Sequence, residues 1–214
     1  MPEYLRPSGP IASRAVLTGD PGRAMMLAQE LTEEPRMTNH ARGLWGYTGT
    51  APDGEPLTVQ ATGIGAPSAA AVLRDLAELG LERAVRVGTC VARTEEYPLG
   101  LLLVVSDAYG GDGVSRSLGR EGPGLRPSIS AEIAAGGGAE LARVASYDSE
   151  PGETTAPADD LQTAALIAVG EELGLEVGAV LVVARDSAGA FIRPDELDAA
   201  AKRAGRLAAA ALSS

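Results

Sequence analysis

Arg86, Gly88 and Thr89 are the residues of this sequence whose types and spacing best suit the binding of an anion. They follow a β-branched, apolar segment, so the sequence predicts a strand over 83–87 that ends in a turn through Gly88 and Thr89. Arginine offers a planar fork of N–H donors, threonine adds a hydroxyl and an amide, and glycine lets an anion approach the backbone. Two interpretations fit this stretch alone: half of a phosphate-binding site, or a buried strand whose arginine makes a surface ion pair.

A second candidate anion site lies near the N-terminus, where a short strand over 15–17 is followed by Gly19, Asp20 and Pro21. Pro21 suits the first position of a helix, and the apolar spacing predicts a helix over 23–31. Asp20 fits the N-cap of that helix. A strand–glycine–helix junction brings free amides and the positive end of a helix dipole to one point, and Arg23 would face the same point.

The composition is that of an ordinary globular protein: 214 residues, of which 22% are charged and 45% apolar, and it predicts one domain over 1–214. A net charge of −11 argues against nucleic acid and against an anionic membrane as partners, so an anionic substrate would need a local cluster of arginines. Cys90 is the only cysteine, which favours a reducing compartment. The sequence shows no apolar stretch of signal-peptide or bilayer length, and we expect a cytoplasmic protein.

Predicted strands and helices alternate along the chain, which indicates an α/β fold with a largely parallel or mixed sheet. The pattern contains an Asp53–Gly54 hairpin turn, and a glycine loop, Gly63-x-Gly65, that leads into a long helix. The further predicted strands are 44–49, 57–61, 101–105, 141–146 and 177–183. The further helices are 68–79, 129–135, one that runs to Leu173 with Asp159 or Asp160 as its cap, and 194–212.

The glycine loop also suggests a dinucleotide-binding fold, because it follows a strand and precedes a helix. Ser68, however, stands where that fingerprint has its third glycine, and the next predicted strand ends in Gly88 and Thr89 with no acidic residue to hold a ribose. We therefore set this interpretation aside.

Four segments in the first half of the chain, taken together, resemble the nucleoside phosphorylase family, which includes uridine phosphorylases, hexameric purine nucleoside phosphorylases and nucleosidases. The resemblance implies a three-layer α/β fold around a mixed, partly barrel-like sheet, assembled as dimers or trimers of dimers. Later in the chain it is looser and is carried by 112–115 and 160–166. The four segments are Gly19–Arg23, Arg42–Gly49, Thr62–Ser68 and Arg86–Cys90.

The resemblance implies phosphorolysis of a nucleoside to a free base and ribose 1-phosphate, with inorganic phosphate as co-substrate and no cofactor. Phosphate must be desolvated, charge-balanced and aimed at the anomeric carbon, and arginines with backbone amides do this. The implied phosphate ligands are Gly19, Arg23, Arg86, Thr89 and, donated by the neighbouring subunit, Arg42.

The implied sugar site departs from the family pattern. Where the family has Glu-Met-Glu, whose second Glu binds the ribose hydroxyls, this chain has Asp160, Leu161 and Gln162. Gln162 still donates and accepts but loses the charge-assisted hydrogen bond. Tyr4 stands in place of a histidine that the neighbouring subunit supplies, and Val91 stands in place of a glycine.

The implied base site is also altered, because the segment 148–158 lacks the aromatic residue that stacks on the base. Glu153 and Thr155 are its nearest counterparts to the residues that recognise uracil. At the end of the last strand, Arg185 aligns without gaps with the proton-donating Asp of purine enzymes, whereas a slip of one residue places Asp186 there. Uridine phosphorylases carry an Arg nearby, so both residues stay candidates.

Other residues that could suggest chemistry have plainer interpretations. His40 suits a strand edge or a subunit contact, Cys90 suits a small buried side chain, and no clustered ligands suggest a metal site. Two alternatives to phosphorolysis remain: a nucleosidase that uses water, and a catalytically weak relative that binds a nucleoside or phosphate. The changes at Gln162, Val91 and Tyr4 motivate the second alternative.

Overall fold

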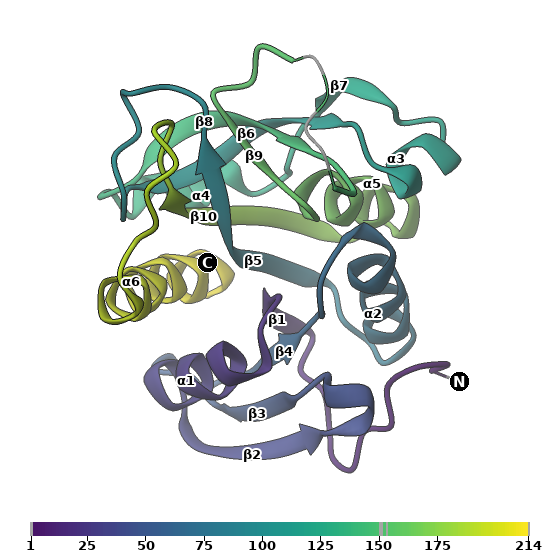
Figure 1. Ribbon diagram of the computed structural model, residues 1–214. Coiled ribbons are helices and arrows are strands. Elements are labelled where there is room, and N and C mark those ends of the chain that lie inside the picture. The colour runs from purple at the N-terminus through teal and green to yellow at the C-terminus, as the bar shows by residue number, and fades with distance from the viewer. Residues whose placement is uncertain (1, 150–151, 153, 214) are drawn as a thin grey trace.

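A closed ring of five strands forms the upper half of the molecule in the computed structural model, which describes residues 2–149, 152 and 154–213 (Figure 1). The ring closes because β10 pairs with both β5 and β6, while β9 pairs with both β8 and β5. Three of its strand pairs are parallel and two are antiparallel, which confirms the mixed, partly barrel-like sheet. Its strands are β5 (Arg83–Ala92), β6 (Leu102–Gly110), β8 (Glu140–Ser146), β9 (Ala158–Asp160) and β10 (Glu176–Arg185).

The sheet continues from β5 through four more strands into the lower half of the molecule. β1 pairs in parallel with both β5 and β4, so the carboxyl ends of β1, β4, β5 and β10 point toward the same edge. The strands here are β1 (Arg14–Thr18), β4 (Pro56–Ala61), β3 (Gly46–Thr50) and β2 (Glu33–Asn39), and a short β7 (Gly122–Leu125) pairs with β6.

Helices cover both faces of the sheet, which confirms the three-layer architecture (Figure 1). α2 (Ala66–Glu78) and α5 (Thr163–Leu173) pack on one face over an apolar cluster that includes Leu73 and Leu166. α1 (Pro21–Leu31), α4 (Ser130–Ala135) and α6 (Pro194–Leu212) pack on the other over a cluster that includes Leu27 and Val180. Short helices α3 (Gly113–Ser117) and η1 (Ala41–Gly43) complete the list.

The predicted helix start at Asp20 is confirmed. The Asp20 carboxylate accepts the Arg23 backbone N–H at 2.7 Å, and Pro21 begins α1. The N-terminus of α1 therefore lies directly after β1, with Gly19 between them. This arrangement follows from local chemistry, because the acidic side chain satisfies an N–H that the first helical turn leaves unpaired.

One local prediction is wrong, one strand was not predicted, and one helix begins later than its expected cap. Gly88 and Thr89 do not form a turn; they lie inside β5, which runs to Ala92 because β10 pairs alongside it. The polar segment Glu33–Asn39 forms β2 at the sheet edge, where mostly exposed side chains carry no hydrophobic pattern. Helix α5 begins only at Thr163, because Asp159 and Asp160 belong to β9, but the Asp160 carboxylate still accepts the Thr163 backbone N–H at the helix start. Within the described residues, no helix is long and apolar enough to cross a membrane.

Candidate functional site

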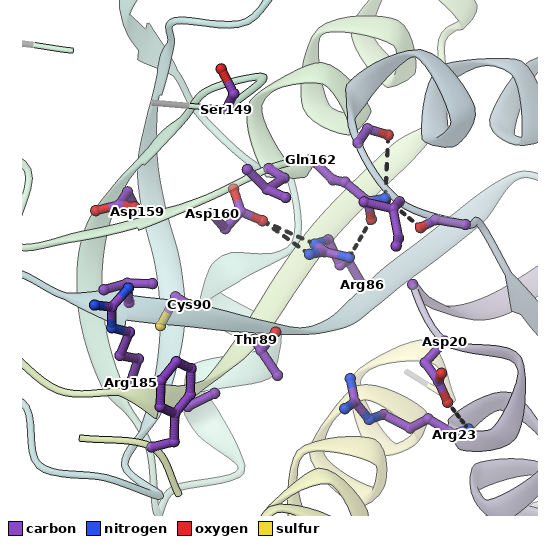
Figure 2. Close-up of a pocket in the computed structure, with 18 of the residues that line it drawn as sticks. Asp20, Arg23, Arg86, Thr89, Cys90, Ser149, Asp159, Asp160, Gln162 and Arg185 are labelled. Atoms are coloured by element: carbon purple, nitrogen blue, oxygen red, sulfur yellow. Dashed lines mark hydrogen bonds and ion pairs between the residues drawn. The ribbon is translucent and has the colours of Figure 1, made fainter. Parts of the chain in front are cut away.

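A cavity of about 950 Å³ lies at the edge of the sheet where β1, β4 and β10 end beside the middle of β5 (Figure 2). Parallel strands bring their following loops to one edge, where ligands of open α/β sheets bind. Eight residues predicted for a site line this cavity: Gly19, Arg23, Arg86, Thr89, Asp160, Leu161, Gln162 and Arg185.

Arg86 is held in one position by residues at the start of α5. Its Nη2 and Nε donate to Asp160 Oδ2 at 3.0 and 3.3 Å, and its Nη1 donates to Gln162 Oε1 at 2.7 Å. Nε also lies 3.2 Å from Thr163 Oγ1. Because these contacts use only part of the five N–H groups of a guanidinium, one N–H on each Nη stays available to a ligand.

Gly88 makes room for this guanidinium. Residues two apart on a strand share a face, so the Arg86 side chain lies along β5 over Gly88. A Cβ atom at Gly88 would lie 2.6 Å from Arg86 Cζ. The glycine that the sequence suggested for anion approach therefore serves the arginine beside it.

The Asp160 carboxylate is buried and fully occupied. Besides Arg86, it accepts hydrogen bonds from Ser146 Oγ at 2.6 Å and from the Thr163 hydroxyl at 2.7 Å and backbone N–H at 3.2 Å. A buried charge is tolerated when it is paired and hydrogen-bonded in this way. Asp160 therefore orients Arg86 and the start of α5.

The Gln162 side chain is also hydrogen-bonded within the protein through both of its polar atoms. Its Nε2 donates to the carbonyl oxygens of Gly63 and Gly65 at 2.6 and 3.2 Å, and its Oε1 accepts from Arg86 and from Thr62 Oγ1. The side chain is 2% exposed. Both polar atoms of this amide therefore have hydrogen-bond partners within the protein. Gln162 thus joins the glycine loop to Arg86, with no polar atom left for a ligand.

Arg23 lies across the same end of the cavity from Arg86 (Figure 2), and Gly19 also lines the cavity. The Arg23 Nε is buried, and no described residue accepts a hydrogen bond from it. Burial lowers the pKa of Arg23; nearby Asp20 opposes this and Arg86 adds to it. A Cβ atom at Gly19 would approach the Gly63 carbonyl oxygen to 3.2 Å, so this loop packs tightly against the glycine loop.

Thr89 and Cys90 lie between these arginines and the far end of the cavity (Figure 2). Burial raises the pKa of the Cys90 thiol, with the charges of Asp160 and Asp159 adding to it. A neutral, buried thiol is a poor nucleophile, in agreement with the interpretation of Cys90 as a packing residue.

The far end of the cavity contains Arg185, whereas Asp186 does not line it. Asp186 holds the turn after β10: its carboxylate accepts the Ala190 N–H at 2.8 Å, and its own N–H donates to the Ala190 carbonyl oxygen at 3.0 Å. It lines a smaller hollow of about 320 Å³ next to the cavity. Arg185 is thus the one of these two candidates that faces the cavity.

Phe191 and Arg93 line the cavity but were not predicted as site residues; Asp159, which the sequence left open as a helix cap or a ribose ligand, lines it as well. Phe191 is 72% exposed, and its ring lies 5.2 Å from Arg185 Cζ. Arg93 forms an ion pair with Asp159. An exposed phenylalanine directly after a strand-end loop was the available sequence signal for Phe191; the Arg93–Asp159 pair depends on β5 lying beside β9 and left no local signal.

Arg42 and Tyr4 do not line the cavity of their own chain. They lie together on the surface, with Arg42 Cζ 5.4 Å from the centre of the Tyr4 ring. The segment that carries Tyr4 is fixed by Asp75, whose carboxylate accepts the backbone N–H groups of Glu3, Tyr4 and Leu5 at 2.7–2.8 Å.

The remaining candidates lie away from the cavity or outside the described chain. Glu153 lies outside the described residues, Thr155 is exposed and does not line the cavity, and His40 is exposed at the start of η1. Among residues 2–149, 152 and 154–213, no cluster of three or more His, Cys, Asp or Glu side chains could hold a metal ion.

Comparison with known proteins places the chain among phosphorylases. The sequence profile of the phosphorylase superfamily matches residues 13–183. The chain is 44% identical over 85 residues to a DeoD-type purine nucleoside phosphorylase of Oceanobacillus iheyensis, covering 39% of this chain and 36% of the relative. It is 36% identical over 103 residues to the DeoD-type enzyme of Clostridium beijerinckii, covering 48% and 43%. The matched stretch thus spans less than half the length of these curated relatives.

The fold is similar to that of uridine phosphorylase from Vibrio fischeri ES114, with a TM-score of 0.83 and 21% sequence identity. The two structures superpose over 94% of this chain and 92% of that one. The superfamily profile matches most of the chain, and it includes Gly19, Arg23, Arg86, Thr89 and Gln162 of the cavity. This chain belongs to the phosphorylase superfamily, as a member of the nucleoside phosphorylase family.

Proposed function

We propose that this protein cleaves the N-glycosidic bond of a nucleoside with inorganic phosphate and releases a free base and ribose 1-phosphate. The observation that supports this most directly is Arg23, whose buried Nε has no acceptor among the described residues and which faces the same cavity as Gly19 and Arg86. An oxyanion placed there would accept from both guanidiniums and from the backbone amides at the start of α1.

In the proposed reaction, Arg23, Arg86, Thr89 and the backbone of Gly19 hold hydrogenphosphate at one end of the cavity. A phosphate oxygen forms a bond to the anomeric carbon as the bond from that carbon to the base nitrogen breaks. The electron pair of the broken bond goes to the base, and the proton of hydrogenphosphate ends on the base. Fixed guanidiniums lower the barrier because they desolvate and position the dianion before the sugar develops positive charge.

The proposed roles of Arg42 and Tyr4 depend on assembly of the protein into an oligomer. Both are joined on one surface outside the cavity of their own chain, and Asp75 holds the Tyr4 segment in place. We propose that the protein forms a homo-oligomer, a dimer or a trimer of dimers, in which this surface faces the cavity of a neighbouring subunit. Arg42 would then supply a further guanidinium to the phosphate, and Tyr4 would contact the sugar.

The test is the release of free base from a panel of nucleosides with and without inorganic phosphate, with ribose 1-phosphate measured as the second product. Phosphorolysis requires equal amounts of base and ribose 1-phosphate and no reaction without phosphate. Base released at the same rate without phosphate would contradict the proposal and indicate hydrolysis.

A second candidate, a catalytically weak binding protein, is favoured by one observation. Both polar atoms of the Gln162 side chain are hydrogen-bonded within the protein, so neither is free to bind the sugar. Their partners are Arg86, Thr62, Gly63 and Gly65. If no nucleoside is cleaved but phosphate and a nucleoside raise the thermal unfolding temperature, this candidate holds.

A further inference from the structure

Arg42 lies at the centre of a turn, residues 40–44, whose backbone conformation an arginine does not favour. Its φ angle is 58°, in the left-handed region that residues other than glycine rarely adopt. Such a conformation persists only where surrounding contacts enforce it. The Arg42 side chain is exposed, so the direction of its guanidinium depends on the backbone that carries it. The contacts that hold this turn therefore decide where the Arg42 charge is presented.

Two buried side-chain amides converge on the end of the Arg42 turn. Asn39 Nδ2 donates to the Leu44 carbonyl oxygen at 2.5 Å, and Gln60 Nε2 donates to the same oxygen at 2.9 Å. Asn39 is 1% exposed and Gln60 is fully buried. Gly46 makes room for the second amide, because a Cβ atom there would collide with Gln60 Oε1. One carbonyl oxygen of the turn is thus held by two side chains from outside it.

The other end of the Asn39 amide binds the N-terminal segment. Its Oδ1 accepts the Arg6 backbone N–H at 2.8 Å, which turns the donor Nδ2 toward Leu44. The N-terminal segment is itself fixed on α2, because the Asp75 carboxylate accepts the three backbone N–H groups of residues 3–5. A continuous series of hydrogen bonds therefore runs from α2 through the N-terminal segment and Asn39 to the turn.

We propose that Asn39 is a positioning residue for Arg42, which holds the turn so that the guanidinium is presented to phosphate in the neighbouring subunit. This rests on the proposed function, in which Arg42 is donated across a subunit interface. Of the two amides, Asn39 is the one that also binds the N-terminal segment, so it sets the turn relative to Tyr4. The distance of 5.4 Å from Arg42 Cζ to the centre of the Tyr4 ring agrees with this. Loss of the Asn39 amide frees the turn to leave the left-handed conformation, which redirects the Arg42 side chain.

Calorimetric titration of inorganic phosphate into the full chain tests this role without requiring catalysis. Arg42→Ala and Asn39→Ala should each weaken phosphate binding about tenfold, the effect of one hydrogen bond from a charged donor. In an Arg42→Ala background, Asn39→Ala should change the affinity less than about twofold, because Asn39 acts through Arg42. Unchanged affinity in either single variant would overturn the inference. A further loss of about tenfold in the double variant would overturn it as well.

Two more variants separate this role from a general effect on packing. Asn39→Leu keeps much of the shape of the side chain and removes both hydrogen bonds. It should weaken phosphate binding as Asn39→Ala does, and it takes the place of that variant if the alanine protein does not fold. Thr38→Ala is the matched control, because Thr38 is the adjacent buried residue, 3% exposed, and its hydroxyl has no partner among the described residues. Weak phosphate binding by Thr38→Ala would assign the effect to packing and overturn the inference.

Initial rates with a nucleoside and phosphate add a second readout. Asn39→Ala should raise the phosphate concentration for half-maximal rate about tenfold and change that for the nucleoside less than about threefold. The reason is that Asp75 still holds the segment that carries Tyr4. An equal rise for both substrates would indicate a general loss of structure and overturn the inference.

The two measurements together distinguish this inference from the proposed function. Phosphate binding that depends on Asn39 through Arg42, with no ribose 1-phosphate formed from any nucleoside, means that the positioning role stands and the proposed function fails. Phosphorolysis by a protein whose phosphate affinity does not depend on Asn39 means that the proposed function stands and the positioning role fails.

Discussion

Replacing Gly88 by alanine is expected to disable the phosphate end of the cavity through a steric effect on Arg86. The new Cβ would lie 2.6 Å from Cζ and Nη2 of Arg86 and 2.8 Å from its Nε. Ordinary contact between such atoms needs about 3.5 Å, so the guanidinium must move by about 1 Å. β5 has extended backbone at this position, so alanine itself is compatible with the strand.

The expected loss of stability follows from the hydrogen bonds that hold the Arg86 guanidinium. Four contacts of 2.7–3.3 Å join Arg86 to Asp160, Gln162 and Thr163. A shift of about 1 Å lengthens them beyond hydrogen-bond range and leaves the buried Asp160 charge partly unpaired. We expect a loss of about 2–4 kcal/mol in the free energy of unfolding and at least a tenfold higher phosphate concentration for half-maximal rate.

Urea unfolding and initial rates over a phosphate series measure both effects. Gly9→Ala is the control, because its added Cβ would make only an ordinary contact, 3.5 Å from Thr38 Cγ2. The decisive comparison is a double-mutant cycle in a background that carries Arg86→Ala and Asp160→Asn. There, Gly88→Ala should change the free energy of unfolding by less than about 0.5 kcal/mol. If Gly88→Ala lowers the free energy of unfolding as much in that background as in the unmodified protein, the steric explanation is refuted.

Three more predictions follow from the structure. Arg23→Ala should raise the phosphate concentration for half-maximal rate about tenfold or more. Arg206 is an exposed ion-pair residue, and Arg206→Ala should leave that concentration unchanged. Because Gln162 has no free polar atom, kcat/KM for a nucleoside and its 2′-deoxy counterpart should agree within about threefold, and a hundredfold ribose preference would contradict this. Hydrogen bonds from Arg14 lower the pKa of Asp53, so their stabilisation is complete above the unfolded-state pKa of about 4 and declines below it. Asp53→Asn should therefore cost about 1–2 kcal/mol at pH 7 in urea unfolding and progressively less as the pH falls below about 4.

The sequence predicted the architecture well because its signals are local. Asp20 and Pro21 define the start of α1 by N-cap chemistry, and the apolar runs around Val180 and Leu103 predict buried strands. The edge strand β2 was missed because it lacks such a local signal. Its side chains are mostly exposed, so no hydrophobic period distinguishes it from a loop. Closure of the ring also has no local signature, since it depends on β10 pairing with two distant strands.

The candidate site could be predicted as a set of residues but not as a set of contacts. Arg23, Arg86 and Gln162 were identified by residue type and motif, and the structure brings them to one cavity. That Gln162 would bind backbone carbonyls on the glycine loop depends on a contact across 99 positions of the chain. The choice between Arg185 and Asp186 depends on the turn at Ala190, which takes Asp186 out of the cavity. Neither relation is encoded in residue type or spacing.

The charges that line the cavity explain how a chain with a net charge of −11 can attract an anion to this point. Arg86 and Arg93 are each paired with a buried aspartate, so their charges are locally balanced. Arg23 and Arg185 have no carboxylate within ion-pair distance among the described residues, which leaves positive charge at both ends of the cavity. Burial strengthens the field at Arg23 because low-dielectric walls reduce screening there, whereas Arg185 is exposed. A ligand that is anionic at one end and rich in acceptors at the other would therefore be oriented before any bond is broken, which is the requirement for in-line attack by phosphate.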